Sequence, residues 1–243
     1  MTGITEVKIY ETPEKIVKAF AKELLRIVNN SDQKRFDIAL SGGETPRLLF
    51  RFLSSKYEDK LPWKRLHFWW GDERCVEPTH EDSNFGVAYD LLFSMIDIPE
   101  ENIHRIKGEN EPEKEAISYS LQIQKELNHR KDWPVFDLII LGMGKDGHTA
   151  SIFPDQINLL ESDKICEVAV HPETGQKRIT LTGKVLNNAH RVYFLVTGHG
   201  KAKRVSQIMN NLKTAQKFPA THIIPENGNL IWYLDEAAAE KIS

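Results

Sequence analysis

Four short apolar segments along the chain share one pattern. They are rich in aromatic and branched residues and alternate only weakly with polar ones, which is typical of strands covered on both faces in a parallel sheet. Each runs directly into glycine and polar residues, and the four lie at 36–40, 66–70, 136–141 and 192–196. Apolar residues recur at helical spacing over 14–28, and the segments 45–57, 112–129 and 201–212 also fit helices.

Strands that alternate with helices in this way predict an α/β fold. We expect an open, mostly parallel, doubly wound sheet of the Rossmann-like type, with right-handed crossovers. A chain of 243 residues fits one such domain, spanning residues 1–243. Ligands of these sheets bind outside the carboxyl ends of the strands. Because all four polar segments follow strands directly, the sequence predicts that they line one polar pocket.

Composition narrows the classes of protein. The formal charge of −3 argues against binding to nucleic acid or to a membrane through bulk positive charge. Cys75 and Cys166 are too few for a disulfide framework or a cysteine-based zinc site, and free thiols favour a reducing, cytoplasmic compartment. The segment Met1–Tyr10 has no signal-peptide pattern, and no apolar run reaches the roughly 18 to 20 residues of a membrane span.

The turn at 41–46 has the chemistry of a phosphate site. Gly42 and Gly43 let backbone N–H groups approach a ligand closely, Ser41 and Thr45 add hydroxyl groups, and a helix N-terminus favours an anion. Lys201 follows Gly200 at the start of a predicted helix, where a lysine opposes the helix dipole unless an anion is also bound. The alternative is a plain tight turn in which a hydroxyl caps the helix.

The loop after the third strand presents a candidate general base. Residues 142–147 match the G-x-G-x-x-G pattern of dinucleotide-binding proteins, but that site needs a sustained helix, which Pro154 prevents. We expect the glycines to shape a loop that presents Asp146 and His148 to the pocket. A histidine suits general-base work on water. No histidine–carboxylate pattern with metal-ligand spacing occurs, so no metal site is predicted.

The second strand ends in charged residues. Arg74 can clamp a phosphate or stabilise an oxyanion, or it can form an internal ion pair with Asp72 or Glu73. Asp72 is a candidate substrate-binding residue. Arg178, which flanks a strand-like stretch at 179–182, is either a further anion ligand or a surface charge, and Lys184 beyond that stretch is expected in a turn at the surface.

Together these motifs resemble the 6-phosphogluconolactonase family. The segments that carry the resemblance occur in the family's order and are SGGETP (41–46), FWWGDER (68–74), DSNFG (82–86), LGMGKDGHTASIFP (141–154), RITLT (178–182), VTGHGKA (196–202) and the closing WYLDEAAA (232–239). The related glucosamine-6-phosphate deaminases have an aromatic residue where this chain has Arg74, which favours the lactonase. Lys184, where the family often has proline, is a departure without consequence for catalysis.

The resemblance implies hydrolysis of 6-phospho-D-glucono-1,5-lactone without metal or redox cofactor, in the second step of the oxidative pentose phosphate pathway. His148 is then the base on water, Arg74 the anion stabiliser, and Asp146 orients His148 or binds a sugar hydroxyl. Ser41, Gly42, Gly43, Thr45, Asp72, Arg178 and Lys201 are the remaining substrate-binding candidates. We expect a monomer or homodimer. Two alternatives stay open: an amino-sugar-phosphate deaminase or isomerase with Asp72 as base, and a sugar-phosphate sensor without catalysis.

Overall fold

The computed structural model describes residues 5–226 and 228–242, so the first four residues of the Met1–Tyr10 segment lie outside the described part. The strands are β1 (Thr5–Tyr10), β2 (Phe36–Leu40), β3 (Leu66–Trp70), β4 (Asp72–Arg74), β5 (His129–Arg130), β6 (Trp133–Pro134), β7 (Leu138–Leu141), β8 (Cys166–Val170), β9 (Lys177–Leu181), β10 (Arg191–Val196) and β11 (Asn229–Asp235). The α-helices are α1 (Pro13–Asn29), α2 (Glu44–Lys56), α3 (Asn84–Leu91), α4 (Pro112–Glu126), α5 (Gly183–Asn188), α6 (His199–Met209) and α7 (Glu236–Ala239).

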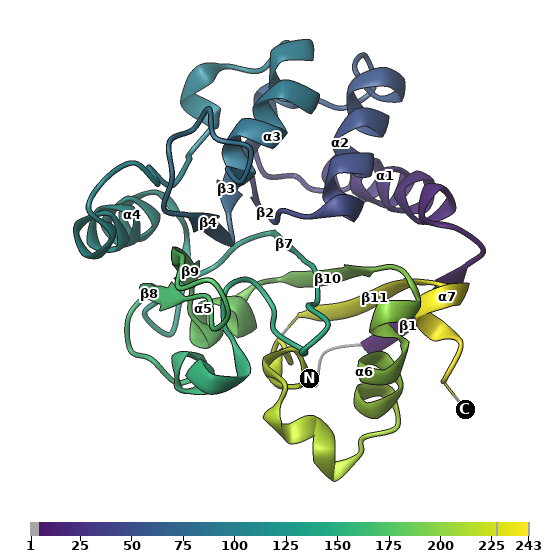
Figure 1. Cartoon of the computed structure of the whole chain (residues 1–243). Coiled ribbons are helices and arrows are strands. Elements are labelled where there is room, and N and C mark those ends of the chain that lie inside the picture. The colour runs from purple at the N-terminus through teal and green to yellow at the C-terminus, as the bar shows by residue number, and fades with distance from the viewer. Residues whose placement is uncertain (1–4, 227, 243) are drawn as a thin grey trace.

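The central sheet has six strands in the order β1-β11-β10-β7-β2-β3, and every pair in it is parallel. Helices α1, α2 and α3 lie on one side of this sheet, and α5 and α6 lie on the other (Figure 1). Strands β2 and β7 are buried along their whole length, which explains why they read as nearly continuous apolar runs. The predicted parallel, doubly wound α/β fold is confirmed.

The helices begin where the local sequence satisfies their first N–H groups. Thr12 caps α1 by accepting a hydrogen bond from the Lys15 N–H, and Pro13 occupies the first turn. The buried face of α1 consists of Ile16, Val17, Phe20, Ala21, Leu24, Ile27 and Val28. Helices α2 and α6 differ, because they begin after Gly43 and Gly198 with no capping side chain. Their first N–H groups are therefore available to a ligand.

Six expected elements differ from the structure only at their ends, and the helices expected at 14–28 and 45–57 are α1 and α2, each shifted by one residue at both ends. The third strand begins at Leu138 rather than at residue 136, and the fourth begins at Arg191. The helix expected to begin at Lys201 begins at His199 and ends at Met209, and the helix expected at 112–129 ends at Glu126. Between Gly147 and β8 the described chain forms only the short 3-10 helix Pro154–Leu160. The long helix that the dinucleotide pattern requires directly after its last glycine is therefore not present there.

A second, antiparallel sheet, β4-β9-β8, was not predicted from the sequence. Its strand β4 is only the charged tripeptide Asp72–Arg74, which has no apolar pattern to identify it. Arg178 lies within β9 rather than beside it, which corrects the prediction that it flanks a strand. Lys184 lies in α5 rather than in a turn, and it pairs with Asp163. No helix among residues 5–226 and 228–242 has the length and apolar character needed to cross a membrane.

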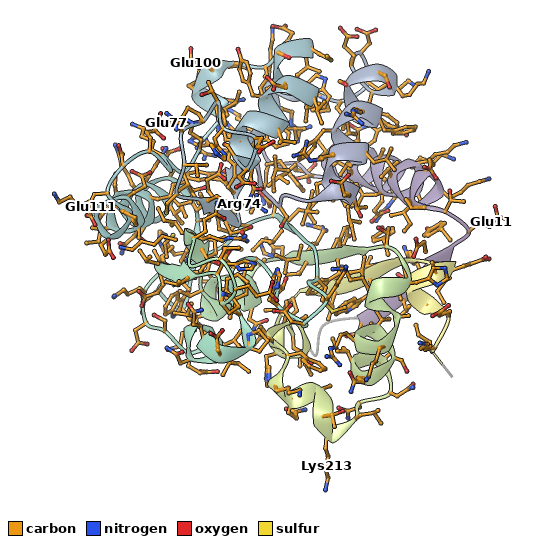
Figure 2. All side chains as sticks on the ribbon, viewed as in Figure 1. Glu11, Arg74, Glu77, Glu100, Glu111 and Lys213 are labelled. Carbon is orange, nitrogen blue, oxygen red and sulfur yellow. The ribbon has the colours of Figure 1, made fainter. Side chains whose placement is uncertain are left out.

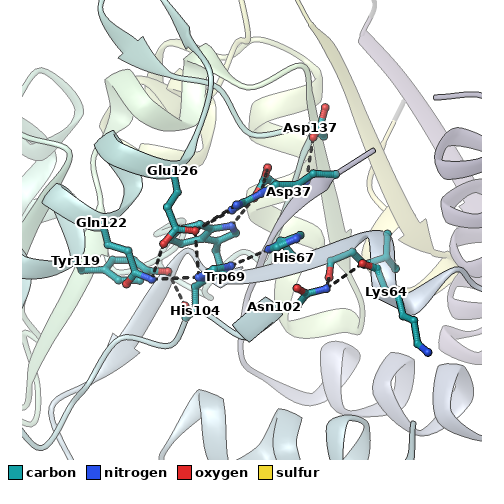
Figure 3. A network of polar contacts seen from close by, with 12 residues as sticks. Asp37, Lys64, His67, Trp69, Asn102, His104, Tyr119, Gln122, Glu126 and Asp137 are labelled. Carbon is teal, nitrogen blue, oxygen red and sulfur yellow. Dashed lines mark hydrogen bonds and ion pairs between the residues drawn. The ribbon is translucent and has the colours of Figure 1, made fainter. Parts of the chain in front are cut away.

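Polar groups form a buried network near the amino ends of β2 and β3 (Figure 3). The indole N–H of Trp69 donates to Asp37 Oδ1 over 2.7 Å, and Arg35 pairs with both Asp37 and Glu126. The His104 ring stacks on Trp69 with ring centroids 3.9 Å apart. Burial lowers the pKa of His104 to about 4, although the charge of Glu126 acts in the opposite direction.

This network predicts that acid destabilises the protein through His104. The pKa of His104 is lower in the folded chain than the ordinary 6.5, so the unfolded chain binds this proton more tightly. The free energy of unfolding is therefore unaffected by this group above pH 6.5 and falls as the pH is lowered toward 4. Between pH 7 and 5 the loss from this group is about 2 kcal/mol. We expect H104Q to show a flatter dependence of the free energy of unfolding on pH over that range.

Urea unfolding at pH 5, 6 and 7 measures this difference. The exposed His129 offers a matched control, since H129Q should keep the slope of the parent protein. Equal slopes for H104Q and the parent protein would show that His104 does not carry the effect.

Candidate active site

A pocket of about 540 Å³ opens at the carboxyl end of the central sheet, where the four polar segments meet. It is lined by residues of the turn after β2, the loop after β7, the segment after β10 and the β8–β9 hairpin, together with Asp72, Arg74 and Asn84. All ten site residues predicted from the sequence line it: Ser41, Gly42, Gly43, Thr45, Asp72, Arg74, Asp146, His148, Arg178 and Lys201. The predicted single polar pocket is thus present, whereas the chemical role of each residue stays a prediction.

His148 is held by a hydrogen bond of 2.7 Å between its Nδ1 and Asp146 Oδ1. Burial alone would raise the pKa of Asp146, but the hydrogen bond to His148 and the charge of that ring outweigh it and lower the pKa to about 2. An ionised carboxylate only accepts, so His148 Nδ1 carries a hydrogen, and Nε2 keeps its lone pair when the ring is neutral. This is the tautomer that a general base needs.

The loop geometry around this pair depends on glycine. A Cβ atom on Gly144 would collide with both the His148 ring and the Asp146 carboxylate. The Gly144 N–H donates to the backbone carbonyl of His148 over 2.9 Å, which closes the loop. The glycine pattern that suggested a nucleotide site therefore serves to hold Asp146 against His148.

Arg74 and Arg178 are direct partners in the antiparallel pairing of β4 with β9. Figure 2 shows Arg74 in the middle of the view, whereas Lys213 and Glu100 project from the periphery. Arg74 donates from Nη1 to the Asp82 carbonyl over 2.6 Å, and neither arginine has a hydrogen-bond partner for its buried Nε among the described residues. Burial lowers the pKa of Arg178, and the charge of Arg74 lowers it further. Two adjacent guanidinium groups with unsatisfied N–H donors favour a bound anion.

The alternative of an ion pair between Arg74 and a neighbouring carboxylate is not observed in the described chain. Glu73 instead accepts the backbone N–H groups of Arg74, Asn84 and Phe85, at 2.7–2.8 Å. Burial raises the pKa of Glu73 to about 7, against the effect of these hydrogen bonds. Asp72 accepts from the Ser151 hydroxyl over 2.6 Å. Both carboxylates are thus bonded within the protein, and Arg74 stays available for a ligand.

A second cationic part of the pocket lies where helices α2 and α6 begin. The Thr45 and Thr197 hydroxyls, one from each segment, lie 2.9 Å apart, and Lys201 lines the pocket beside them. Burial lowers the pKa of Lys201, the charge of Asp146 raises it, and Lys145 lowers it. The uncapped helix starts and the lysine ammonium together suit a phosphate group.

Ser41 and Gly42 also contact neighbouring segments of the protein. The Ser41 hydroxyl donates to the Ile140 carbonyl over 2.8 Å, so its hydrogen is used within the protein. At Gly42 any Cβ would overlap the side-chain amide of Asn84, which explains why glycine is required there. The Ser41 hydroxyl thus ties the end of β2 to β7, and the substrate-binding roles of Ser41 and Gly42 stay predictions.

The lining residues that were not predicted from the sequence include four with polar side chains: Asn84, Lys145, His171 and Thr197. Three of them stand inside motifs that the analysis had singled out for other residues. His171 lies in no such motif, and nothing in its local sequence separates it from the other histidines. Cys75 does not line the pocket, and burial raises the pKa of its thiol to about 11, so this thiol is a poor nucleophile.

Comparison with known proteins defines the family. The family described as glucosamine-6-phosphate isomerases and 6-phosphogluconolactonase matches residues 11–232. This chain belongs to that family. It is 48% identical over 202 residues to a 6-phosphogluconolactonase of Haemophilus influenzae, covering 83% of this chain and 85% of the relative. It is 42% identical over 232 residues to that of Aggregatibacter actinomycetemcomitans, covering 95% and 97%.

A solved 6-phosphogluconolactonase from Trypanosoma brucei has the same fold as this chain. It superposes with a TM-score of 0.89 over the full length of both chains at 29% identity. The resemblance stated from the motifs is confirmed, and it places the chain with the lactonase members of the family. Within the described residues no three histidine, cysteine, aspartate or glutamate side chains gather in a way that would hold a metal ion.

Proposed function

We propose that this enzyme hydrolyses 6-phospho-D-glucono-1,5-lactone to 6-phospho-D-gluconate, the second step of the oxidative pentose phosphate pathway. The activity agrees with the lactonase relatives, which cover nearly the whole chain. The observation that supports it most directly is the 2.7 Å contact between Asp146 and His148 in the pocket that also contains Arg74. A base, an anion stabiliser and a phosphate site are what a phosphorylated cyclic ester requires.

In the proposed mechanism, His148 Nε2 removes a proton from water as the water oxygen attacks C1 of the lactone. Arg74 stabilises the negative charge that develops on the carbonyl oxygen. The bond between C1 and the ring oxygen then breaks, and the protonated His148 returns its proton to that oxygen. Asp146 keeps the ring in the required tautomer and stabilises its charged form. Hydrolysis changes no oxidation state, so no redox partner is needed, and the carboxylic acid formed at C1 releases its proton to water.

We assign the phosphate to the starts of α2 and α6. Lys201, Thr45 and the backbone N–H groups after Gly43 line the pocket where these helices begin, whereas the pair of arginines lies on β4 and β9. This division leaves Arg74 for the C1 end of the substrate. We also infer from the two free cysteines that the enzyme acts in the cytoplasm, and we expect a monomer or homodimer.

Product formation tests the proposed reaction. Glucose-6-phosphate dehydrogenase generates the lactone in place, and a second dehydrogenase reports 6-phosphogluconate. We expect a protein-dependent rate well above spontaneous hydrolysis at slightly acidic pH. Ammonia release from glucosamine 6-phosphate, with no lactone hydrolysis, would instead support the deaminase alternative. Ligand binding without either reaction would support the sensor.

Lys201 provides a test of the phosphate assignment. We expect K201A to raise KM by about 10- to 100-fold while kcat changes little, because a charge-assisted hydrogen bond to phosphate forms equally in the ground and transition states. Steady-state kinetics measure both constants. The control is K203A on the same helix, where the side chain is exposed and does not line the pocket. A collapsed kcat with an unchanged KM would instead place Lys201 at the reacting carbonyl.

A further inference from the structure

His171 lies at the tip of the β8–β9 hairpin, and neither the motifs nor the proposed mechanism gives it a role. It lines the same pocket as His148. Both imidazoles pack against the ring of Phe153, with centroids 4.8 Å away for His148 and 5.2 Å away for His171. Phe153 is fully buried and thus forms a fixed support for the two rings. The tertiary structure therefore brings a second histidine close to the proposed base.

The hydrogen bonds of His171 define its tautomer. Nδ1 accepts from the backbone N–H groups of Glu173 and Thr174, each over 3.3 Å. Backbone N–H groups can only donate, so Nδ1 carries no hydrogen and Nε2 carries it. Two backbone hydrogen bonds of 2.9 Å hold the turn. The His171 N–H donates to the Gln176 carbonyl, and the Gly175 N–H donates to the His171 carbonyl. The hairpin thus presents an N–H donor on a rigid support.

The ring also stays neutral. Burial lowers the pKa of His171, and the positive charge of Arg178 lowers it further. A neutral ring with one N–H donates a single directed hydrogen bond and adds no charge to the pocket. That is suitable for recognising a hydroxyl group, whereas phosphate and oxyanion sites use the cations described above.

We propose that His171 Nε2–H donates a hydrogen bond to the substrate hydroxyl next to the reacting carbonyl, the C2 hydroxyl, and so selects 2-hydroxylated lactones. This rests on the proposed function, in which His148 marks the position of C1. Because the rings of His171 and His148 pack on the same Phe153, His171 lies beside the position of C1 that His148 marks, whereas the phosphate is assigned to Lys201 and the starts of α2 and α6. C2 bears the free hydroxyl nearest to C1.

The test combines one variant with two substrates. H171N keeps an acceptor at the position of Nδ1, so that the turn at Glu173 and Thr174 is preserved, and it removes the Nε2 donor. We expect kcat/KM for the natural lactone to fall about tenfold, the equivalent of one lost hydrogen bond. For the lactone made from 2-deoxyglucose 6-phosphate we expect less than about a twofold change. H171Q, whose amide nitrogen can replace Nε2–H, should restore part of the rate on the natural lactone.

The controls separate recognition from structure. H129N, at an exposed histidine outside the pocket, should behave as the parent protein on both substrates, and the thermal unfolding of H171N should match that of the parent. An equal loss on the two lactones would mean that His171 only shapes the pocket, and no loss on either would mean no contact; both results overturn the proposal. A parent protein inactive on both lactones would instead reject the proposed function itself.

Discussion

We expect H148A to lower kcat for the phosphorylated lactone by about 10²- to 10⁴-fold, the usual effect of losing a general base. The imidazole is the group in the pocket whose Nε2 lone pair is directed by an ionised partner, since Asp146 holds Nδ1 at 2.7 Å. KM should change little, because the base contributes mainly to the transition state. Spontaneous hydrolysis must be subtracted, and the coupled assay with and without enzyme allows this.

Two further measurements sharpen the result for H148A. Added imidazole should restore part of the lost rate, since the vacated volume next to Asp146 can admit the free base. H129A, which removes an exposed histidine, should keep the parent rate. A kcat for H148A close to that of the parent enzyme would rule out His148 as the base.

The second large effect is expected for R74M. Methionine retains part of the apolar stem but lacks the guanidinium group, so a stabilised oxyanion loses its partner. Removing one such donor typically costs about 10²- to 10³-fold in kcat. Steady-state kinetics of R74M and R74K measure the effect. We expect R74K to recover only part of the rate, because a lysine lacks the planar fork of donors that also contacts the Asp82 carbonyl.

R105M is a matched control, since Arg105 pairs with Glu109 outside the pocket. R178M gives a useful comparison on the neighbouring strand, where the second guanidinium lies. If R74M raises KM and leaves kcat intact, Arg74 holds the phosphate, and the assignment of the two ends of the pocket must be reversed.

The sequence by itself determined the class of fold and the location of the chemistry. The apolar runs at 36–40 and 66–70 coincide with β2 and β3, because a strand covered on both faces is made mostly of apolar residues. The glycine-rich turns follow these strands directly, and parallel strands bring their carboxyl ends to one edge. For this reason the residues of the turn at 41–46, the loop at 142–148 and Lys201 were predicted together and line one pocket.

Only the tertiary structure decided the contacts between segments that are distant in the chain. The pairing of Arg74 with Arg178 depends on the antiparallel sheet, whose strand Asp72–Arg74 is too short and too polar to show a periodic pattern. The hydrogen bond of the Ser41 hydroxyl goes to the carbonyl of Ile140, 99 residues further along the chain, which no local pattern predicts. His171 reaches the pocket because the β8–β9 hairpin folds over Phe153. Local patterns encode strands, turns and helix starts, whereas long-range packing decides which side chains meet and which polar groups stay free for a substrate.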